Sequence, residues 1–396
     1  MRNAYPLLFS LAALLLALPA QAQTDYMDVA TEADLLDGGT LAEVDIACID
    51  RAADGTFVFF NTPSDELVSY DPDAAPGSRT TILRTNAELL TDTGVTVTAC
   101  RALDIADDGA VIAALAGADN LDFVYRLDGG TATVLTDPAS LGDNGDGVTG
   151  LDVDGSTVYL ARSAFFGAPE DGFYSLDATT AGQDPTAILQ NADLDLYDVA
   201  AGDDGCLYSN SSEFGGTGFV NVTVSVCDLD TTPVLSVVYD PFADGIFTNG
   251  SDGGLEDIEL GPAGIYLFNN SFGATEGEQW GFVEYGGTGG VQFANETALV
   301  ADADVSLLAY TAPSGTHTIL QDGVIYEASS SSFGGTDGIV KFTDIPGAPG
   351  CEAKFTSADL AYDAGTRRLS VTGGVRNNGA DPVPLRLELR YNRDGG

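Results

Sequence analysis

The sequence predicts an all-β protein with the architecture of a six-bladed β-propeller. Two observations carry this prediction. A unit of four short β-rich runs, separated by Gly- and Asp-containing turns, recurs along the chain about every 46 to 60 residues, which is the spacing of propeller blades. The last unit lacks its fourth run, and a matching run stands near the start of the chain.

The first strand of each unit is an apolar phrase that carries an acidic residue, as in "ALDIADDG" and "GLDVDG". The segment "VSLLAYTAPSG" (305–315) takes the sixth place without the acid. Because propeller blades surround one axis, symmetry brings several of these carboxylates to one end of the central channel. The shared acids are Asp45, Asp104, Asp152, Asp198 and Asp257.

The second and third strands of each unit form a hairpin, and four of the hairpins share a Phe-Gly pair in the connecting loop. Gly supplies the positive φ that a tight connection needs. These loops lie on the face from which the chain enters the inner strands, so they form an arc on one rim. Two roles stay open for the Phe side chains: packing between neighbouring blades, or an aromatic rim that faces a ligand. The four residues are Phe166, Phe214, Phe272 and Phe333.

The start of the mature chain predicts how the ring closes. "YMDVATEADLLDGGT" (26–40) reads like "TILRTNAELLTDTGV" (81–95), which is the outer strand of the first unit with its trailing segment. We therefore expect the N-terminus to supply the outer strand of the sixth blade. Main-chain hydrogen bonds would then close the ring without leaving an open edge.

Residues 1–22 have the features of a cleaved secretory signal: one cation, an apolar stretch and a final Ala-Gln-Ala. The stretch is too short to span a bilayer comfortably, and no other segment approaches ~20 apolar residues. We expect a secreted or cell-surface protein with no membrane span, in which residues 23–350 form the propeller.

The charge of the chain is strongly acidic and unevenly distributed. Residues 23–350 hold seven cations and 54 acids, a net charge of −47, whereas residues 351–396 hold seven cations and six acids, a net charge of +1. This break indicates a domain boundary, and the lack of a basic footprint excludes nucleic-acid binding. The acids are interpreted either as a solubility surface of a salt-adapted bacterium or as charge matched to a polycationic or calcium-rich partner.

Residues 351–396 contain two or three amphipathic runs and an "NNG" turn, which suggests the opening of an immunoglobulin-like sandwich. About 45 residues hold too few strands to complete that fold. We therefore expect a truncated immunoglobulin-like segment, so that the sequence is a piece of a longer protein.

The five cysteines stand in an exported chain, where disulfides are permitted. Cys206 and Cys227 flank one hairpin symmetrically, so they are expected to face each other and form a bond. Cys48 and Cys100 occupy similar places at the start of consecutive units and make the second expected pair. Cys351 is left over.

The phrases "LDIADDGAVIAAL" and "LDVDGSTVYLARS", followed by hairpins that end in "VYRLD" and "YSLD", resemble six-bladed propellers of the NHL and gluconolactonase-like group. The resemblance covers about 320 residues. It implies the propeller fold and, for the gluconolactonase-like members, a metal held at the axis by acidic and amide side chains. The exported start, the propeller and the trailing sandwich together look like surface cargo of the type IX secretion route.

The single histidine, His317, limits the possible chemistry. Histidine-based zinc sites, Ser-His-Asp hydrolysis and histidine-dependent quinone sugar dehydrogenases would all have to depend on it alone. It stands in a β-like run without a second histidine, so we expect no chemical role for it. The Gly-Gly pairs are interpreted as turns, because no phosphate-binding or dinucleotide motif surrounds them.

Oxygen-ligand chemistry remains, and it points to the axial acids. Clustered carboxylates repel one another unless a cation lies among them, and calcium prefers six to eight oxygen ligands. One interpretation is a calcium site at Asp104, Asp152 and Asp198. The other is that these side chains accept hydrogen bonds from neighbouring backbone N–H groups and brace the blades.

The sequence favours an exported or cell-surface, monomeric propeller that acts as a non-catalytic binding or scaffold module for an extracellular ligand of unknown identity. Propeller loops recognise many kinds of partner, so the fold alone does not name this ligand. The alternative is a calcium-dependent, lactonase-like hydrolase that uses the axial carboxylates and a metal-bound water.

Overall fold

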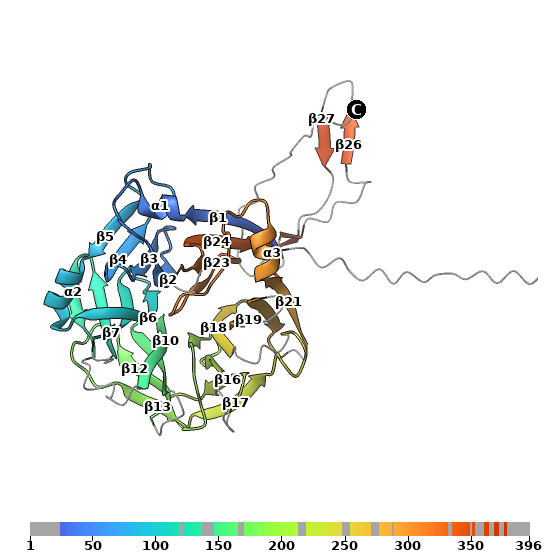
Figure 1. Cartoon of the computed structure of the whole chain (residues 1–396). Coiled ribbons are helices and arrows are strands. Elements are labelled where there is room, and N and C mark those ends of the chain that lie inside the picture. Colours follow the sequence, from blue (N-terminus) through green and yellow to red (C-terminus); the bar gives the residue numbers. More distant parts are fainter. Residues whose placement is uncertain are drawn as a thin grey trace, which may run out of the picture.

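Six four-stranded antiparallel sheets surround a central axis in the computed structural model of the chain (Figure 1). This confirms the six-bladed β-propeller. The structure describes residues 24–118, 122–136, 146–164, 170–212, 219–247, 254–270, 277–286, 289–331 and 335–348, and four short strands beyond them. The predicted signal at 1–22 and all four Phe-Gly loop residues lie outside the described residues.

Blades 1 to 5 are each built from four consecutive strands, and blade 6 combines three consecutive strands with β1; the first strand of each set lies innermost (Figure 1). Residues alternate between the two faces of these strands, and most face another blade, so the second and third strands read as nearly continuous apolar runs. Blade 1 contains β2 (Ile46–Arg51), β3 (Phe57–Asn61), β4 (Glu66–Tyr70) and β5 (Thr80–Arg84), and blade 2 contains β6 (Val97–Ile105), β7 (Val111–Gly117), β8 (Asp122–Asp128) and β9 (Thr131–Val134). Blade 3 contains β10 (Asp146–Asp154), β11 (Thr157–Ala164), β12 (Gly172–Asp177) and β13 (Thr186–Gln190), and blade 4 contains β14 (Ala200–Ala201), β15 (Leu207–Ser211), β16 (Val222–Cys227) and β17 (Val234–Tyr239). Blade 5 contains β18 (Gly254–Gly261), β19 (Gly264–Asn270), β20 (Gln279–Glu284) and β21 (Gly290–Asn295), and blade 6 contains β22 (Thr318–Gln321), β23 (Val324–Ser329), β24 (Gly338–Thr343) and β1 (Asp25–Thr31).

The N-terminal strand closes the ring, as the sequence predicts. Strand β1 runs antiparallel to β24, with Tyr26 opposite Phe342. The two rings also meet edge to face, with centroids 5.1 Å apart, and both side chains are buried. The outer strand of the last blade therefore comes from the opposite end of the propeller sequence.

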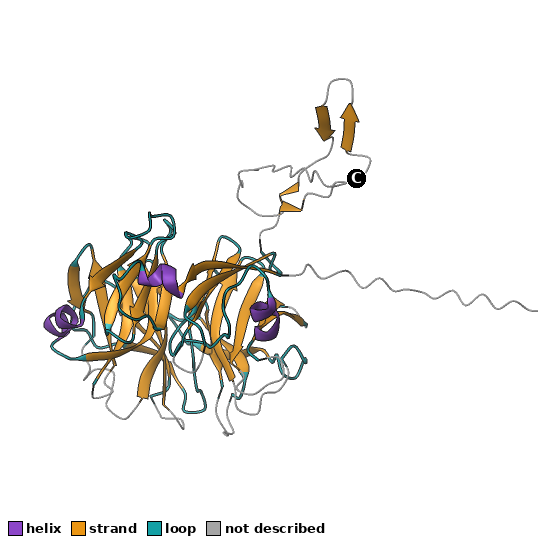
Figure 2. Ribbon diagram, turned by 45° about the horizontal axis from the view of Figure 1, so that its top comes forward, coloured by secondary structure: helices purple, strands orange, loops and turns teal. Residues whose placement is uncertain are grey.

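Three short helices follow outer strands and lie at the periphery of the ring (Figure 2). They are α1 (Glu32–Leu36), α2 (Asn86–Thr93) and α3 (Glu296–Ala301). The first two begin with a capping box, in which Thr31 pairs with Asp34 and Thr85 with Glu88. The likeness between "TEADLL" and "TNAELL" in the sequence is therefore that of two capped helix starts.

Hydrophobic side chains from facing blades form a cluster at each junction between neighbouring blades. The cluster between blades 1 and 2 includes the Cys48–Cys100 disulfide, which joins the two inner strands β2 and β6. The Cys206–Cys227 disulfide joins the start and the end of one hairpin in blade 4. Both predicted cysteine pairs are confirmed.

Beyond the propeller the described strands are β25 (Cys351–Glu352), β26 (Leu360–Asp363), β27 (Arg368–Val371) and β28 (Arg376–Asn377). Two pairs form, β25 with β28 and β26 with β27. The immunoglobulin-like segment stays a prediction. In the part of the chain that the structure describes, no helix is long and apolar enough to cross a membrane.

Candidate functional site

A ring of carboxyl groups connects the inner strands. In each case a side chain from one blade accepts a hydrogen bond from a backbone N–H of the next blade, across five successive junctions. The acceptors and donors are Asp50 with Ile105 (2.8 Å), Asp104 with Val153 (2.6 Å), Asp152 with Ala201 (2.5 Å), Asp198 with Ile258 (3.2 Å), and Asp257 with both His317 and Thr318 (2.8 Å each). The ring therefore braces neighbouring blades.

Asp45 does not belong to this ring, although the sequence predicts it there. The hairpin register places Asp50 opposite Val58, as Asp104 lies opposite Ile112. Asp45 lies five residues earlier, and its carboxylate accepts from Ser330 in blade 6 at 2.5 Å. Asp45 directly precedes β2 and Asp50 lies within it, and a register shift between Ile46 and Ile49 separates them. In the phrase "EVDIACID" either acid can be aligned with the ring acids of the other units.

Four acids of the ring line a channel cavity of about 270 Å³ together with Glu259, whereas the fifth, Asp257, lines the cavity described below. The four are Asp50, Asp104, Asp152 and Asp198. Surrounding protein desolvates these carboxyl groups, and each is close to others of the same charge. Burial, with a smaller contribution from neighbouring carboxylates, raises the pKa of Asp50 to about 6 and the pKa values of Asp104 and Asp152 to about 8. The same two causes raise the pKa of Asp198 and Glu259 well above their ordinary values. Several members of the ring are therefore protonated near neutral pH.

The hydrogen bonds of the ring bear on the calcium interpretation. In Asp104, Asp152 and Asp198 both carboxylate oxygens accept backbone N–H groups, one from the following residue and one from the next blade. Oxygens engaged in this way have fewer lone pairs for a cation. Among the described residues, no group of three or more His, Cys, Asp or Glu is arranged to hold a metal ion. These carboxyl groups are therefore better suited to bracing neighbouring blades through hydrogen bonds than to coordinating calcium. The calcium site stays a prediction.

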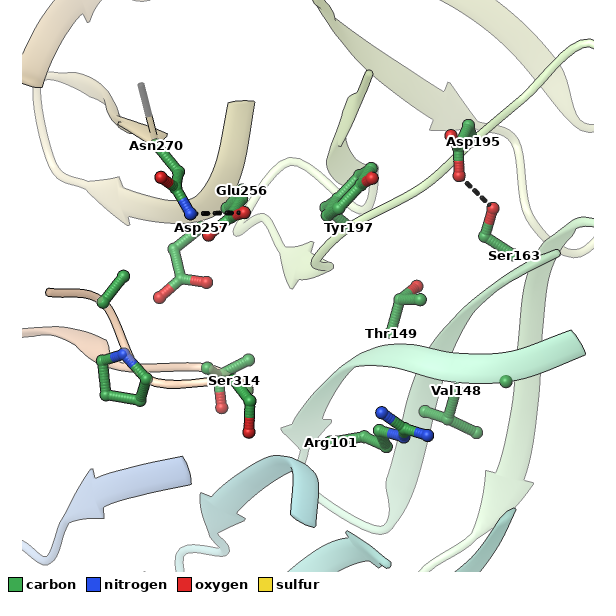
Figure 3. A pocket seen from close by; sticks show the side chains of 15 residues that line it. Arg101, Val148, Thr149, Ser163, Asp195, Tyr197, Glu256, Asp257, Asn270 and Ser314 are labelled. Carbon is green, nitrogen blue, oxygen red and sulfur yellow. Dashed lines mark hydrogen bonds between the residues drawn. The ribbon is translucent and has the colours of Figure 1, made fainter. Parts of the chain in front are cut away.

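A second, larger cavity of about 550 Å³ lies where the chain enters the inner strands (Figure 3). Its lining comes from blades 2 to 5 and from the segment that leads into blade 6. Arg101 in β6 and Thr149 in β10 each precede the ring acid of the same strand by three positions, so the two cavities follow each other along the channel. The residues that line this axial cavity with polar groups include Arg101, Thr149, Ser163, Asp195, Tyr197, Glu256, Asp257, Asn270, Ser314 and Thr316.

One wall of the axial cavity is formed by Glu256, Asp257 and Asn270. The Asn270 amide donates to Glu256 at 2.9 Å, while its carbonyl oxygen Oδ1 has no hydrogen-bond partner although the residue is only 7% exposed. Burial, and then the neighbouring Asp257, raise the pKa of Glu256 to about 8. Buried acceptors without a donor are uncommon in proteins, and the protein encloses this oxygen so that it has almost no accessible surface.

The opposite wall carries Arg101, Thr149 and Ser163, as Figure 3 shows. The Ser163 hydroxyl donates to Asp195 at 2.6 Å. The guanidinium of Arg101 lies 3.7 Å from the buried carboxylate of Asp122, whose other oxygen accepts from the Val148 N–H. Arg101 is therefore already opposed by an acid behind it.

The segment 312–316 reaches across the channel and forms the floor of the axial cavity. The N–H of Gly315 donates to the Ala47 carbonyl in blade 1, and the N–H of Thr316 donates to the Arg101 carbonyl in blade 2. A Cβ atom on Gly315 would lie 2.6 Å from that Arg101 oxygen, so only glycine allows this approach. The sixth unit lacks the ring acid, and its entering segment contacts the first two blades directly instead.

The side chain of His317 contacts both this floor segment and the acidic wall of the cavity. Its Nδ1 lies 2.9 Å from the Gly315 carbonyl and 3.1 Å from the Asp257 carboxylate, and its Nε2 lies 3.4 Å from Glu327. The imidazole ring of His317 is buried and packs edge to face on Phe268, with the two ring centroids 4.6 Å apart. The sequence predicts no role for His317, and its surroundings show a structural one: it holds Asp257 and the floor in place.

Among the residues that line the axial cavity, Asp257 alone was predicted as a site residue from the sequence. Glu256 stands beside it in "LEDIEL", but the register shift between Leu255 and Ile258 decides which neighbouring acid faces which cavity. Asn270 and Tyr197 lie at the end and before the start of β-rich runs, where polar residues are common. Only the shared fold brings them together.

No protein-family model matches the chain, and no curated protein matches it. Solved structures are similar to it in fold. A protein of unknown function from Bacteroides thetaiotaomicron is 11% identical with a TM-score of 0.50, over 81% of this chain and 76% of that one. A luciferin-regenerating enzyme is 11% identical with a TM-score of 0.49, over 81% and 95%. Virginiamycin B lyase from Staphylococcus aureus is 11% identical with a TM-score of 0.44, over 81% and 99%. Such likeness concerns the fold alone.

Proposed function

We propose that this protein is an exported, non-catalytic propeller whose axial cavity binds a small polar ligand. The observation that carries the proposal is the convergence of polar side chains from blades 2 to 5, and from the segment that leads into blade 6, on one cavity of about 550 Å³, which is within the ordinary size of small-molecule sites. The two disulfides are consistent with an extracellular protein.

The binding part of this proposal is tested by filling the cavity. In Thr149→Trp an indole would occupy the space beside Arg101, so any small polar molecule that binds the wild-type protein should lose its affinity. The matched control is Leu308→Trp, because Leu308 is 89% exposed and lies outside the cavity lining. Binding that survives Thr149→Trp unchanged would contradict the cavity as the site.

The second candidate is the calcium-dependent, lactonase-like hydrolase, which the resemblance to gluconolactonase-like propellers favours. Metal analysis of the purified protein and a lactone-hydrolysis assay separate the two candidates. If the protein is non-catalytic, lactone hydrolysis in its presence should not exceed the uncatalysed rate. Turnover that is lost both on chelation and in Asp152→Asn would overturn it.

A further inference from the structure

Strand β17, the outer strand of blade 4, has an open edge. It pairs with β16 on one side, and the sheet ends on the other side. Figure 1 shows it at the periphery of the ring. In the part of the chain that the structure describes, residues 234–238 make no hydrogen bond apart from those of the ladder with β16. An edge of this kind presents N–H and C=O groups to any segment that can pair with them.

The outer strands of the other blades are either engaged or less apolar. In β1 the Asp28 N–H, and in β9 the Val134 carbonyl, bond to a backbone group of another segment. In β21 the Phe293 carbonyl accepts from the Thr24 hydroxyl. Strand β5 ends in the cation Arg84 and leads into α2, and neither β5 nor β13 has an exposed large hydrophobic side chain. Among the outer strands, β17 alone combines an open edge with an apolar surface.

The side chains of β17 favour pairing with a further strand. Its sequence, Val-Leu-Ser-Val-Val-Tyr, contains no charge, although charged residues are a common protection of open edges. Val234, Val237 and Val238 are 50%, 51% and 36% exposed, and valine packs well between neighbouring strands. A register shift leaves Val238 as an extra residue opposite β16. The regular part of the edge is therefore residues 234–237, which suits a short segment.

Acids on both sides of the strand decide what the edge can accept. Asp228 and Asp230 precede it, and Asp240 and Asp244 follow it. None of the four forms an ion pair with a described residue. A second copy of β17 would bring the same acids against them in either strand direction, and like charges across paired strands repel each other. A segment with cations at both ends would instead meet opposite charges.

We propose that the edge of β17 binds an extended segment of another protein, which adds to blade 4 as a fifth strand. The segment carries β-branched residues at its centre and Lys or Arg at both ends. Main-chain hydrogen bonds supply the pairing, and the exposed valines supply apolar contacts. This surface is separate from the axial cavity, so the inference goes beyond the function proposed for that cavity and does not depend on it.

The test uses the peptide Lys-Arg-Val-Thr-Val-Thr-Val-Arg-Lys, blocked at both ends and labelled for fluorescence anisotropy. One control peptide is N-methylated at the central Val and the following Thr, which removes a donor from each edge. A second control has Glu in place of all four cations. With the mature protein in ~0.15 M sodium chloride, we expect saturable binding of the first peptide. Both controls should bind at least about tenfold more weakly, because one loses main-chain hydrogen bonds and the other loses charge complementarity.

Hydrogen exchange on the wild-type protein locates the bound peptide. Amides within residues 234–238 should exchange at least about tenfold more slowly in the complex, while those of β13 should not change.

Two variants make the same charge change at different places. Val237→Lys puts a cation on the edge and should weaken binding by about tenfold or more. Leu308→Lys lies outside β17 at a residue that is 89% exposed, so it should leave the affinity unchanged. Melting curves check that both variants are folded, and the hydrogen-exchange result does not depend on either of them.

Several results would overturn the proposal. Equal binding of the N-methylated peptide would show attraction between charges without strand addition. Equal binding of the Glu-containing peptide would remove the requirement for cations. Protection outside β17, an unchanged affinity in Val237→Lys, or no binding of the first peptide would exclude this edge as its site. Self-association of the wild-type protein that Val237→Lys abolishes, without peptide binding, would assign the edge to a second copy instead.

Discussion

At the scale of single residues, the carboxyl ring stabilises blade junctions at an electrostatic cost. Each ring acid accepts an N–H from the next blade, and this favours its charged form. Desolvation and neighbouring acids oppose that charge, and they dominate at Asp104, whose pKa is raised to about 8. The folded protein therefore holds protons that the unfolded chain releases near pH 4.

This proton uptake predicts how stability depends on pH. Between about pH 4 and pH 8 the folded state binds more protons than the unfolded state, so stability falls as the pH rises, by up to about 1.4 kcal/mol per pH unit for each such group. The melting temperature should therefore decrease from pH 5 to pH 9. In Asp104→Asn the slope should be shallower, because the amide does not titrate, while the same change at exposed Asp107 should leave the slope unchanged. Equal slopes in all three proteins would contradict the raised pKa.

Gly315 provides a second test at this scale. A Cβ atom there would lie 2.6 Å from the Arg101 carbonyl oxygen, so Gly315→Ala should displace the floor of the axial cavity and lower the free energy of unfolding by roughly 1–3 kcal/mol. Gly289→Ala is the control, because nothing lies within 4 Å of its Cβ position. Chemical denaturation measures both, and a loss as small as that of the control would show that the floor adjusts freely.

Some residue positions follow from the sequence and others do not. Cys206 and Cys227 could be paired because a hairpin places residues symmetrically about its turn. The shift from Asp45 to Asp50 could not be foreseen, because it depends on a register shift in β2. The role of His317 was missed because its partners, Asp257 and Glu327, come from other strands.

At the scale of elements, the decisive contact is β1 with β24. The sequence predicts it from an excess of inner strands over outer strands, and the structure confirms it residue by residue, with Tyr26 opposite Phe342. Strand counts and repeated phrases carry this information because each blade must be complete. The short helices after the outer strands could be aligned with each other but not recognised as helices, since α1 has only five residues.

Removal of the closing strand is expected to open the ring. Deletion of residues 23–36 removes β1 and α1, so β24 loses its outer partner and Phe342 loses its edge-to-face contact with Tyr26. We expect a much lower melting temperature or aggregation, because the freed edge can pair with other chains. The control is deletion of residues 351–396, which leaves the pairing of β1 with β24 untouched and should leave a folded monomer. Thermal melting and size-exclusion chromatography compare the two; a harmless N-terminal deletion would contradict closure by β1.

At the scale of the whole molecule, the acidic surface decides the response to salt. With 54 acids and seven cations in residues 23–350, most carboxylates have no basic partner, and their mutual repulsion destabilises the compact state. The Debye length falls from ~10 Å at 0.1 M to ~3 Å at 1 M salt. The melting temperature should therefore rise as sodium chloride is increased to molar concentration. A flat or falling curve would show that the acids are compensated locally.

Closure by β1 also has a consequence in time. The strand that completes blade 6 is the first of the propeller to be synthesised, and its partner β24 is the last, more than 300 residues later. The ring cannot close until nearly the whole propeller has emerged, and contacts so distant in sequence are slow to form. During that interval β1 is an unpaired strand and β24 has no neighbour on its outer side. Until the last blade has been made, both edges of the final hydrogen-bonded seam therefore stay open, wherever the chain folds.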